Sequence, residues 1–141
     1  MQLSLGTEIR LPAPFDEAIA QVRAALQKEG FGVLTHIDMQ AAFREKLGRE
    51  FRPYAILGAC NPPLAYEALG ADPTVGLLLP CNVTVEAADA GESVVRLSDP
   101  QVLLAAGTLA ENETLRQVAD DARGRLERVA AALSKTAPAT S

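Results

Sequence analysis

The sequence predicts an α+β protein of two layers, a mainly antiparallel sheet with helices packed on one face and a long C-terminal helix. Three observations carry this prediction. Short apolar runs alternate with amphipathic helical patterns along the chain. Two consecutive strand patterns flank a turn-like segment at residues 87–92, which indicates an antiparallel hairpin. Apolar residues recur every three or four positions through residues 115–133, as in a long helix packed along a narrow seam.

Strands are expected at residues 2–11, 31–37, 54–60, 76–86 and 93–98. The first alternates between an apolar and a polar face, so one face should be buried. The strand at residues 54–60 is uncharged on both faces and is expected to be covered on both sides. Pro80 lies within the fourth strand and cannot donate to a ladder, so it marks an edge position or a bulge. The residues expected to share one face of a strand are Leu3, Leu5, Ile9 and Leu11 in the first strand; Phe31, Val33, Thr35 and Ile37 in the second; and Leu77, Leu79, Cys81, Val83 and Val85 in the fourth.

Helices are expected between these strands, each with a start or stop signal. Asp38 and Asn61 are well placed to cap helices at residues 39–47 and 62–70, because their side chains can accept from free N–H groups of the first turn. A helix that follows Pro14 should end at Gly30. A short helix is expected at residues 101–106, and the long one from about residue 113. The helix at residues 39–47 should bury Met39, Ala42, Phe43 and Leu47.

The composition predicts a single domain at residues 1–134, with a patternless, disordered tail at residues 135–141. A net charge of -5 without a basic cluster argues against nucleic-acid binding. No apolar run reaches the length of about 20 residues needed to cross a bilayer, and the first residues lack a secretory signal, so a cytoplasmic location is expected. The 2 cysteines are too few for a disulfide scaffold and are expected to remain thiols.

The candidate site is built on Cys60 and Cys81, each followed by an asparagine. Two apolar strands that carry the same Cys-Asn step are expected to bring their thiols together. With His36 as a third donor, the set favours a soft or borderline ion such as Cu(I) or Zn(II), or another small ligand. The competing interpretation is that both cysteines are small core residues and that His36 is a hydrogen-bonded structural histidine.

Two further hypotheses concern chemistry at these positions. Cys60 precedes a helix start, where the helix dipole would lower its thiol pKa and favour sulfur or redox chemistry. Lys46 and Arg52 flank one loop and could hold an anion near Asn61. Asn61 also serves as a helix cap, and Asn82 could bond a neighbouring backbone group near Pro80. No motif fixes a reaction, so enzymatic activity is left open.

A hypothesis of a different class is an interaction module without chemistry. An open sheet face, or an edge near Pro80, would then pair with a second copy of the chain. Such a seam would account for an apolar Leu34 and a lone His36 on the same strand face.

Three segments carry a resemblance to a known family: THIDMQAAFREKLG (residues 35–48), FRPYAILGACNPPLAYEAL (residues 51–69) and GLLLPCNVTV (residues 76–85). The chain resembles the domain of unknown function 302 family over nearly its whole length. The resemblance implies a fold like that of the TATA-box-binding protein and a homodimer, with no established activity. A nucleic-acid role does not come with that fold, because fold alone does not carry function. Motif positions match at His36, Asp38, Lys46, Arg52, Cys60, Asn61, Pro62, Cys81 and Asn82.

Overall fold

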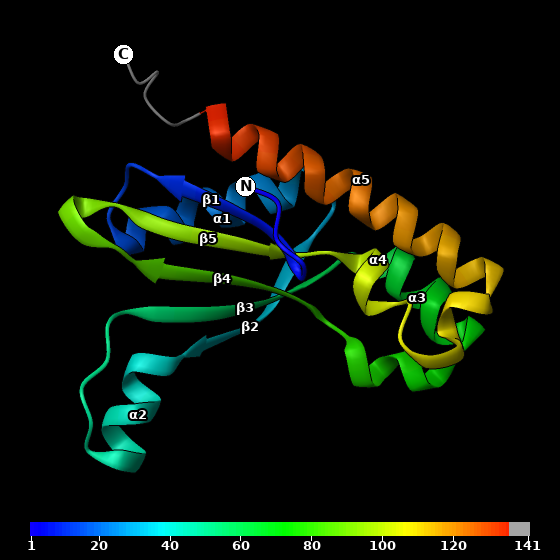
Figure 1. Cartoon of the computed structure of the whole chain (residues 1–141), viewed down its shortest axis with the longest axis horizontal. Helices are drawn as coiled ribbons and strands as arrows, with labels where there is room; N and C mark the ends of the chain where they lie inside the picture. The colour runs from blue at the N-terminus through cyan, green and yellow to red at the C-terminus, as the bar shows by residue number, and fades with distance from the viewer. Residues whose placement is uncertain (136–141) are drawn as a thin grey trace.

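A computed structural model describes residues 1–135 of the chain (Figure 1). Its helices and strands follow one another in the order expected of an α+β protein, with three short 3₁₀ helices between them. The elements are β1 (Gly6–Leu11), α1 (Phe15–Lys28), β2 (Gly32–Asp38), α2 (Met39–Leu47), β3 (Tyr54–Cys60), α3 (Pro62–Ala71), a 3₁₀ helix (Pro73–Leu78), β4 (Cys81–Ala87), a 3₁₀ turn (Asp89–Gly91), β5 (Ser93–Ser98), α4 (Pro100–Leu103), a 3₁₀ helix (Gly107–Glu111) and α5 (Glu113–Lys135).

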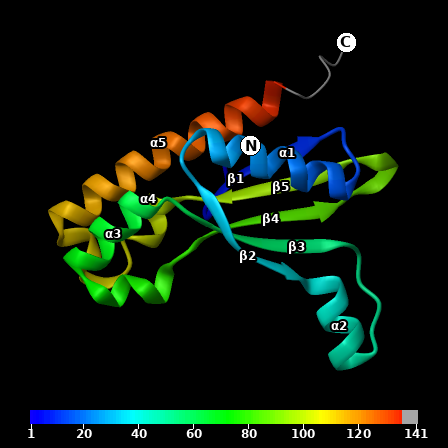
Figure 2. The same cartoon turned by 180° about the vertical axis from the view of Figure 1, so that it is seen from behind.

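The strands form one five-stranded sheet in the order β1-β5-β4-β3-β2. All four neighbouring pairs are antiparallel. Helices α1 and α5 pack against each other and cover one face of the sheet (Figure 2). The predicted fold class is therefore confirmed, and the opposite sheet face is left without a helical layer.

The main core lies between this sheet face and helices α1 and α5. The apolar stripe of α1 is buried, and so is the predicted seam of α5. Full burial of one aliphatic side chain contributes about 1.5–3 kcal/mol. Helix α5 runs through Lys135, a residue that the sequence assigned to the tail, and the other predicted tail residues lie outside the described part. The core side chains of the sheet are Ile9, Leu11, Ala55, Leu57, Ala59, Val83, Val85, Val95 and Leu97.

A second, smaller core lies beyond one end of the sheet. There α3, α4 and the first half of α5 pack together with the 3₁₀ helices at residues 73–78 and 107–111. Figure 1 shows this group at one end of the molecule and α2 at the other. Its buried side chains are Ala68, Val75, Leu104, Leu115, Val118 and Ala119.

Two strand predictions were wrong in part. The first strand begins at Gly6, not at residue 2, and Leu5 is 71% exposed. Residues 76–80 do not form the start of a strand, because residues 73–78 are a 3₁₀ helix and β4 begins at Cys81. Pro80 therefore precedes β4, and β4 is an interior strand, so there is no sheet edge near Pro80.

The prediction that Val33, Thr35 and Ile37 share one face of β2 was also wrong. Its pairing with β3 shifts between Val33 and Thr35, so an extra residue interrupts the alternation of side chains. As a result Thr35 and Ile37 lie opposite Gly58 and Ile56, on the sheet face without helices. Ile37 is 46% exposed.

Helix α2 forms where it was predicted, but it buries none of its side chains. The Asp38 side chain caps it by accepting from the backbone N–H of Ala41 at 3.0 Å, and Gly48 ends it at a φ of 63°. Both figures show α2 projecting away from the body of the protein (Figures 1 and 2). Of the stripe predicted to be buried, Met39, Ala42 and Phe43 are half-buried and Leu47 is exposed. No helix within residues 1–135 is long and apolar enough to cross a bilayer.

Candidate functional site

The two cysteines line one small cavity at the end of the sheet, between the two cores. Strands β3 and β4 supply the thiols, and helices α3, α4 and α5 supply most of the remaining walls. The cavity has a volume of about 40 Å³. Its lining residues are Phe31, Ala59, Cys60, Asn61, Leu64, Ala65, Ala68, Leu79, Pro80, Cys81, Pro100, Leu103, Leu104, Val118 and Ala122.

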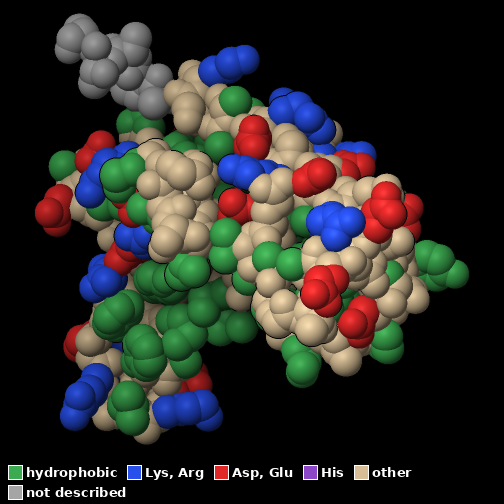
Figure 3. Space-filling view, turned by 45° about the vertical axis from the view of Figure 1, so that its right-hand side comes forward, with side chains coloured by type: hydrophobic (Ala, Val, Ile, Leu, Met, Phe, Trp, Pro, Cys, Tyr) green, Lys and Arg blue, Asp and Glu red, His purple; other side chains and the backbone are tan. Residues whose placement is uncertain are grey.

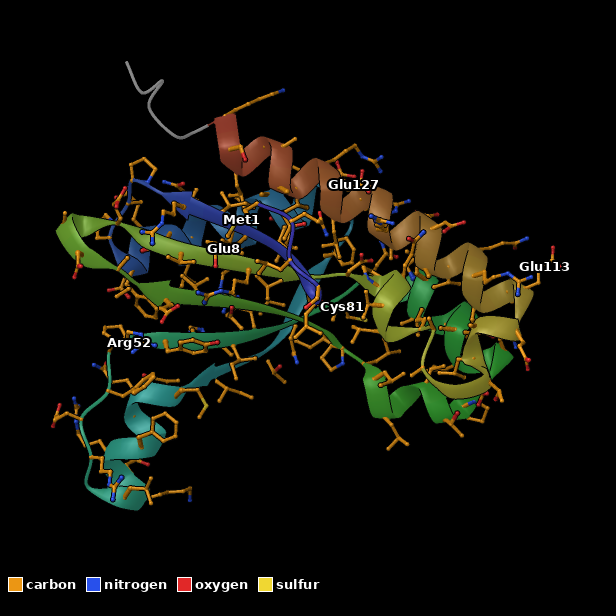
Figure 4. The ribbon with its side chains drawn as sticks, viewed as in Figure 1. Met1, Glu8, Arg52, Cys81, Glu113 and Glu127 are labelled. Carbon is orange, nitrogen blue, oxygen red and sulfur yellow. The ribbon has the colours of Figure 1, made fainter. Side chains whose placement is uncertain are left out.

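Strand pairing brings the two cysteines to the same end of the sheet, and both line the cavity there. Ala59 lies directly opposite Cys81 in the β3–β4 ladder, so Cys60 is one position away from the direct partner of Cys81. Cys81 shares a face with Val83, as predicted, and Figure 4 shows it where β4 meets the end of the sheet that carries α3 and α4. Both cysteines are half-buried and neither is in a disulfide. The prediction that the two thiols are neighbours agrees with this geometry.

The cavity keeps both thiols protonated near neutral pH. Burial, together with the nearby Cys60, raises the pKa of the Cys81 thiol to about 11. Burial also raises the pKa of Cys60 above its ordinary value. The sequence predicted a lowered pKa for Cys60 from its place before α3, so the structure reverses that expectation. Because the thiolate is the reactive form, neither cysteine is activated as a nucleophile.

Asn61 is a buried side chain with a structural role. Its Oδ1 accepts from the backbone N–H of Leu64 at 3.3 Å, which caps α3. Its Nδ2 donates to the backbone carbonyl of Glu29 at 3.4 Å. Both ends of the amide are therefore engaged, so the thiols are the cavity's available polar side-chain groups.

His36 does not join the cysteines. It lies opposite Leu57 in the β2–β3 ladder, whereas Cys60 lies opposite Gly32. The His36 ring is exposed, and its Nδ1 is 3.1 Å from a guanidinium nitrogen of Arg23 on α1. Within residues 1–135 no group of three or more His, Cys, Asp or Glu side chains could hold a metal ion. The three predicted metal donors therefore do not form one site.

The other predicted binding residues are also dispersed. Arg52 and Cys81 lie at opposite ends of the sheet (Figure 4), and Lys46 is exposed on α2. The expected anion site of Lys46 and Arg52 beside Asn61 is therefore not assembled, because Asn61 follows the far end of β3. Asn82 is exposed and lies opposite Gly58, on the sheet face away from Cys81.

Sequence reasoning missed an ion network on the sheet face without helices. Glu86 of β4 is 8% exposed and accepts hydrogen bonds from Arg52 and, at 2.6 Å, from Arg96. Arg96 also donates to Glu8 at 3.0 Å. Burial opposes ionisation of Glu86, yet hydrogen bonds from Arg96 and Arg52 hold its pKa below the usual range. Glu86 and Arg96 both occupy outward positions in the predicted hairpin, and this pattern could have indicated the ion network.

Glu86→Gln is expected to destabilise the fold by about 1–2 kcal/mol at pH 7, because it removes a charged acceptor from two arginines. A carboxyl group whose pKa is lower in the folded than in the unfolded protein stabilises the fold when the pH is above the unfolded-state pKa. That contribution disappears as the pH falls through the folded-state pKa. The variant should therefore lose less stability than the wild type on acidification. Urea unfolding at pH 7 and in acid measures both effects.

The control is Glu50→Gln, which removes an exposed ion pair with Arg44. It should change stability by less than about 0.5 kcal/mol. Equal losses in the two variants would contradict a special role for the buried carboxylate.

Comparison with known proteins identifies a family without a known activity. The family model described as "Domain of unknown function DUF302" matches residues 7–133. The structure resembles the crystal structure of an uncharacterized conserved DUF302 protein from Bacillus stearothermophilus, with a TM-score of 0.80 and 26% sequence identity. The alignment covers 93% of this chain and 99% of that one. No match was found among curated proteins. The chain thus belongs to the DUF302 family of domains of unknown function.

Proposed function

We propose that the chain binds one soft metal ion, Cu(I), between Cys60 and Cys81. One observation carries the proposal: thiols from two neighbouring strands line the same small cavity, whose other walls are almost entirely apolar. Sulfur ligands select Cu(I) over harder ions, which prefer oxygen. The proposed activity is binding, without turnover of a substrate.

The size of the cavity supports an ion over a larger ligand. A cavity needs about 10–15 Å³ to hold one water molecule, whereas pockets for drug-sized molecules usually exceed about 300 Å³. The cavity between Cys60 and Cys81 has about 40 Å³. It therefore suits a single ion or a molecule of a few atoms better than a sugar or a nucleotide.

The number of donors supports Cu(I) over Zn(II). Structural zinc sites almost always use four protein ligands, and catalytic ones use three. Residues 1–135 place no third His, Cys, Asp or Glu donor in a group with the two thiols. A two-sulfur site matches Cu(I) best, and His36 is left out of the proposed ligand set.

The raised thiol pKa values argue against thiol redox chemistry at this cavity. A protonated thiol is a poor nucleophile, so the cavity disfavours attack by Cys60 or Cys81 on a substrate. A bound ion instead displaces the thiol protons to solvent as the two S–Cu bonds form, with no change in oxidation state. The proposal assumes the reducing, cytoplasmic location that the sequence favours.

The test is titration of the reduced protein with Cu(I) against a competing Cu(I) chelator, without oxygen and with a reductant. We expect one bound ion per chain, and we expect Cys60→Ser and Cys81→Ser each to abolish this binding. Bound Cu(I) should also stabilise the wild type against unfolding, by about 2.7 kcal/mol at a free concentration one hundred times the dissociation constant.

His36→Ala is the matched control, because the histidine lies away from the cavity. It should bind Cu(I) as the wild type does. Binding that survives in the Cys60→Ser/Cys81→Ser variant, or no retained ion in the wild type, would refute the proposal.

A further inference from the structure

We propose that the sheet face without helices binds a small uncharged molecule rich in hydroxyl groups, of the size of a monosaccharide. The site is a pocket of about 270 Å³ over β4 and β5, next to the start of β1. The inference is independent of the proposed Cu(I) site, because no residue that lines this pocket also lines the cavity of Cys60 and Cys81. The polar side chains that carry the argument are Tyr54, Asn82, Thr84, Arg96 and Ser98.

Strand pairing gathers most of these side chains on one face. Thr84 lies directly opposite Arg96 in the β4–β5 ladder, and Ser98 is two residues beyond Arg96 on β5. Asn82 is two residues before Thr84 on β4, and Glu86 is two residues after it. Side chains two residues apart point to the same side of a strand. All of them therefore belong to the sheet face that carries the ion network of Glu86.

Two buried hydroxyls in this pocket have no hydrogen-bond partner. Within residues 1–135 the buried side-chain polar atoms without a partner are Oγ1 of Thr84 and Oγ of Ser98, and both residues line the pocket. A buried hydroxyl without a partner costs stability, so such atoms are rare in folded proteins. A ligand in the pocket would supply the missing partner. Rotation about χ1 turns either hydroxyl toward the pocket without breaking an existing hydrogen bond.

Two further polar side chains of the pocket are unengaged. The hydroxyl of Tyr54 and the side-chain amide of Asn82 make no hydrogen bond within the described part of the chain. Asn82 is exposed, and the Cu(I) site gives it no role. Hydroxyl and amide groups both donate and accept hydrogen bonds. The pocket therefore matches a ligand whose own groups do the same, as hydroxyl groups do.

The charges beside the pocket favour an uncharged ligand. Arg96 already donates to Glu8 at 3.0 Å and to Glu86 at 2.6 Å. Glu86 also accepts from Arg52, so two arginines and two glutamates balance one another. An anion would have to compete with two carboxylates for Arg96, and a cation would meet a guanidinium group. Figure 3 shows basic and acidic side chains interspersed on this side of the molecule.

The size and walls of the pocket favour a compact ligand with an apolar face. Pockets for drug-sized molecules measure about 300–1,000 Å³, so a pocket of about 270 Å³ suits a molecule of about a dozen non-hydrogen atoms. Leu3 and Leu5 of the N-terminal segment contribute apolar walls, and Leu5 is 71% exposed. Tyr54 contributes an aromatic ring. The C–H face of a sugar ring packs on such groups while its hydroxyls reach the polar side chains.

The test is titration of the isotope-labelled protein with D-glucose, D-galactose and D-mannose in the millimolar range, followed by the chemical shifts of the backbone amides. We expect at least one of these sugars to shift the amides around Thr84 and Ser98 in a saturable manner. The uronate and the amino sugar that correspond to the best binder carry a negative and a positive charge on the same ring. Each should bind at least about tenfold more weakly than the uncharged sugar.

Thr84→Val/Ser98→Ala removes both unpartnered hydroxyls and should abolish the shifts while the protein gains stability. Because each hydroxyl is buried without a partner, the melting temperature should rise by at least about 4 °C. A substitution that merely damaged the fold would lower it. Thr114→Val is the matched control, because Thr114 is exposed near the start of α5, and this variant should bind the sugar as the wild type does.

Three binding results would each overturn the proposal: no saturable shift with any of the three sugars, undiminished binding by the double variant, or tighter binding of a charged analogue. A lower melting temperature of the double variant would show that the two hydroxyls stabilise the fold. That result would overturn their assignment to a ligand.

Discussion

Raising the pH from 7 to 8 is expected to strengthen Cu(I) binding by up to about a hundredfold, a tenfold gain for each of two displaced protons. Burial raises the thiol pKa of Cys60, and it raises that of Cys81 to about 11 with a contribution from Cys60. Both thiols are therefore protonated in this range. Each must lose a proton to bind the ion, so affinity rises with pH until the pH approaches the pKa values.

The measurement is competition with a chelator whose own Cu(I) affinity is constant over this pH range. If the cysteines had the ordinary pKa near 8.5, the rise of Cu(I) affinity with pH would flatten above about pH 8 to 9. Affinity that is already constant between pH 7 and 8 would contradict the raised pKa values. A slope of one proton would mean that a single thiol binds the ion, and would contradict the two-sulfur site.

The convergence of Cys60 and Cys81 could be predicted because it depends on local signals. Cys60 ends one strand pattern, Cys81 lies within the next, and the two strands pair in the sheet. The position of His36 could not be predicted, because it depends on the register of β2 against β3. That register contains an irregularity at Val33 and Thr35 that no local pattern indicates.

The largest error in the fold prediction has a similar origin. Residues 76–79 form a continuous apolar run, and such a run does not distinguish a strand from a buried helical turn. Asp72 decides the outcome, because its side chain accepts from the backbone N–H of Thr74 at 2.9 Å and caps the 3₁₀ helix that follows. Leu77 is consequently 89% exposed instead of lying inside the sheet.

The cavity walls show a further limit of the sequence. Helix α5 was predicted from its spacing, yet the same spacing does not say that Val118 and Ala122 face the thiols. Alanines at cavity positions on α3 and α5 leave room beside Cys60. Small residues occur in helices for many other reasons, so their presence in the sequence does not predict a cavity. For α2 the pattern predicted an amphipathic helix correctly and could not say what covers its apolar stripe, because local amphipathicity names no partner.

Gly58→Ala is expected to destabilise the protein by about 1–3 kcal/mol, the usual cost of adding a methyl group to a tightly packed site. A Cβ atom at Gly58 would lie 2.3 Å from Oγ1 of Thr35 and 2.7 Å from Cγ of Pro80. Relief requires movement of Pro80, the residue before Cys81. The substitution should therefore also weaken Cu(I) binding, which separates it from a purely global loss of stability.

The matched control is Gly124→Ala in the interior of α5, where the nearest atom to an added Cβ is 3.7 Å away. It should stabilise the protein by about 0.5–1 kcal/mol, because alanine loses less conformational freedom than glycine in a helix.

In the Gly58→Ala background, Thr35→Ala removes one of the two clashes and should recover part of the lost stability, as a double-mutant cycle by urea unfolding would measure. Recovery of Cu(I) affinity should be smaller, since the clash with Pro80 persists beside Cys81. Gly58→Ala with wild-type stability would mean that β2 and the segment before β4 are not held against β3, and the placement of Cys81 beside Cys60 would lose its support.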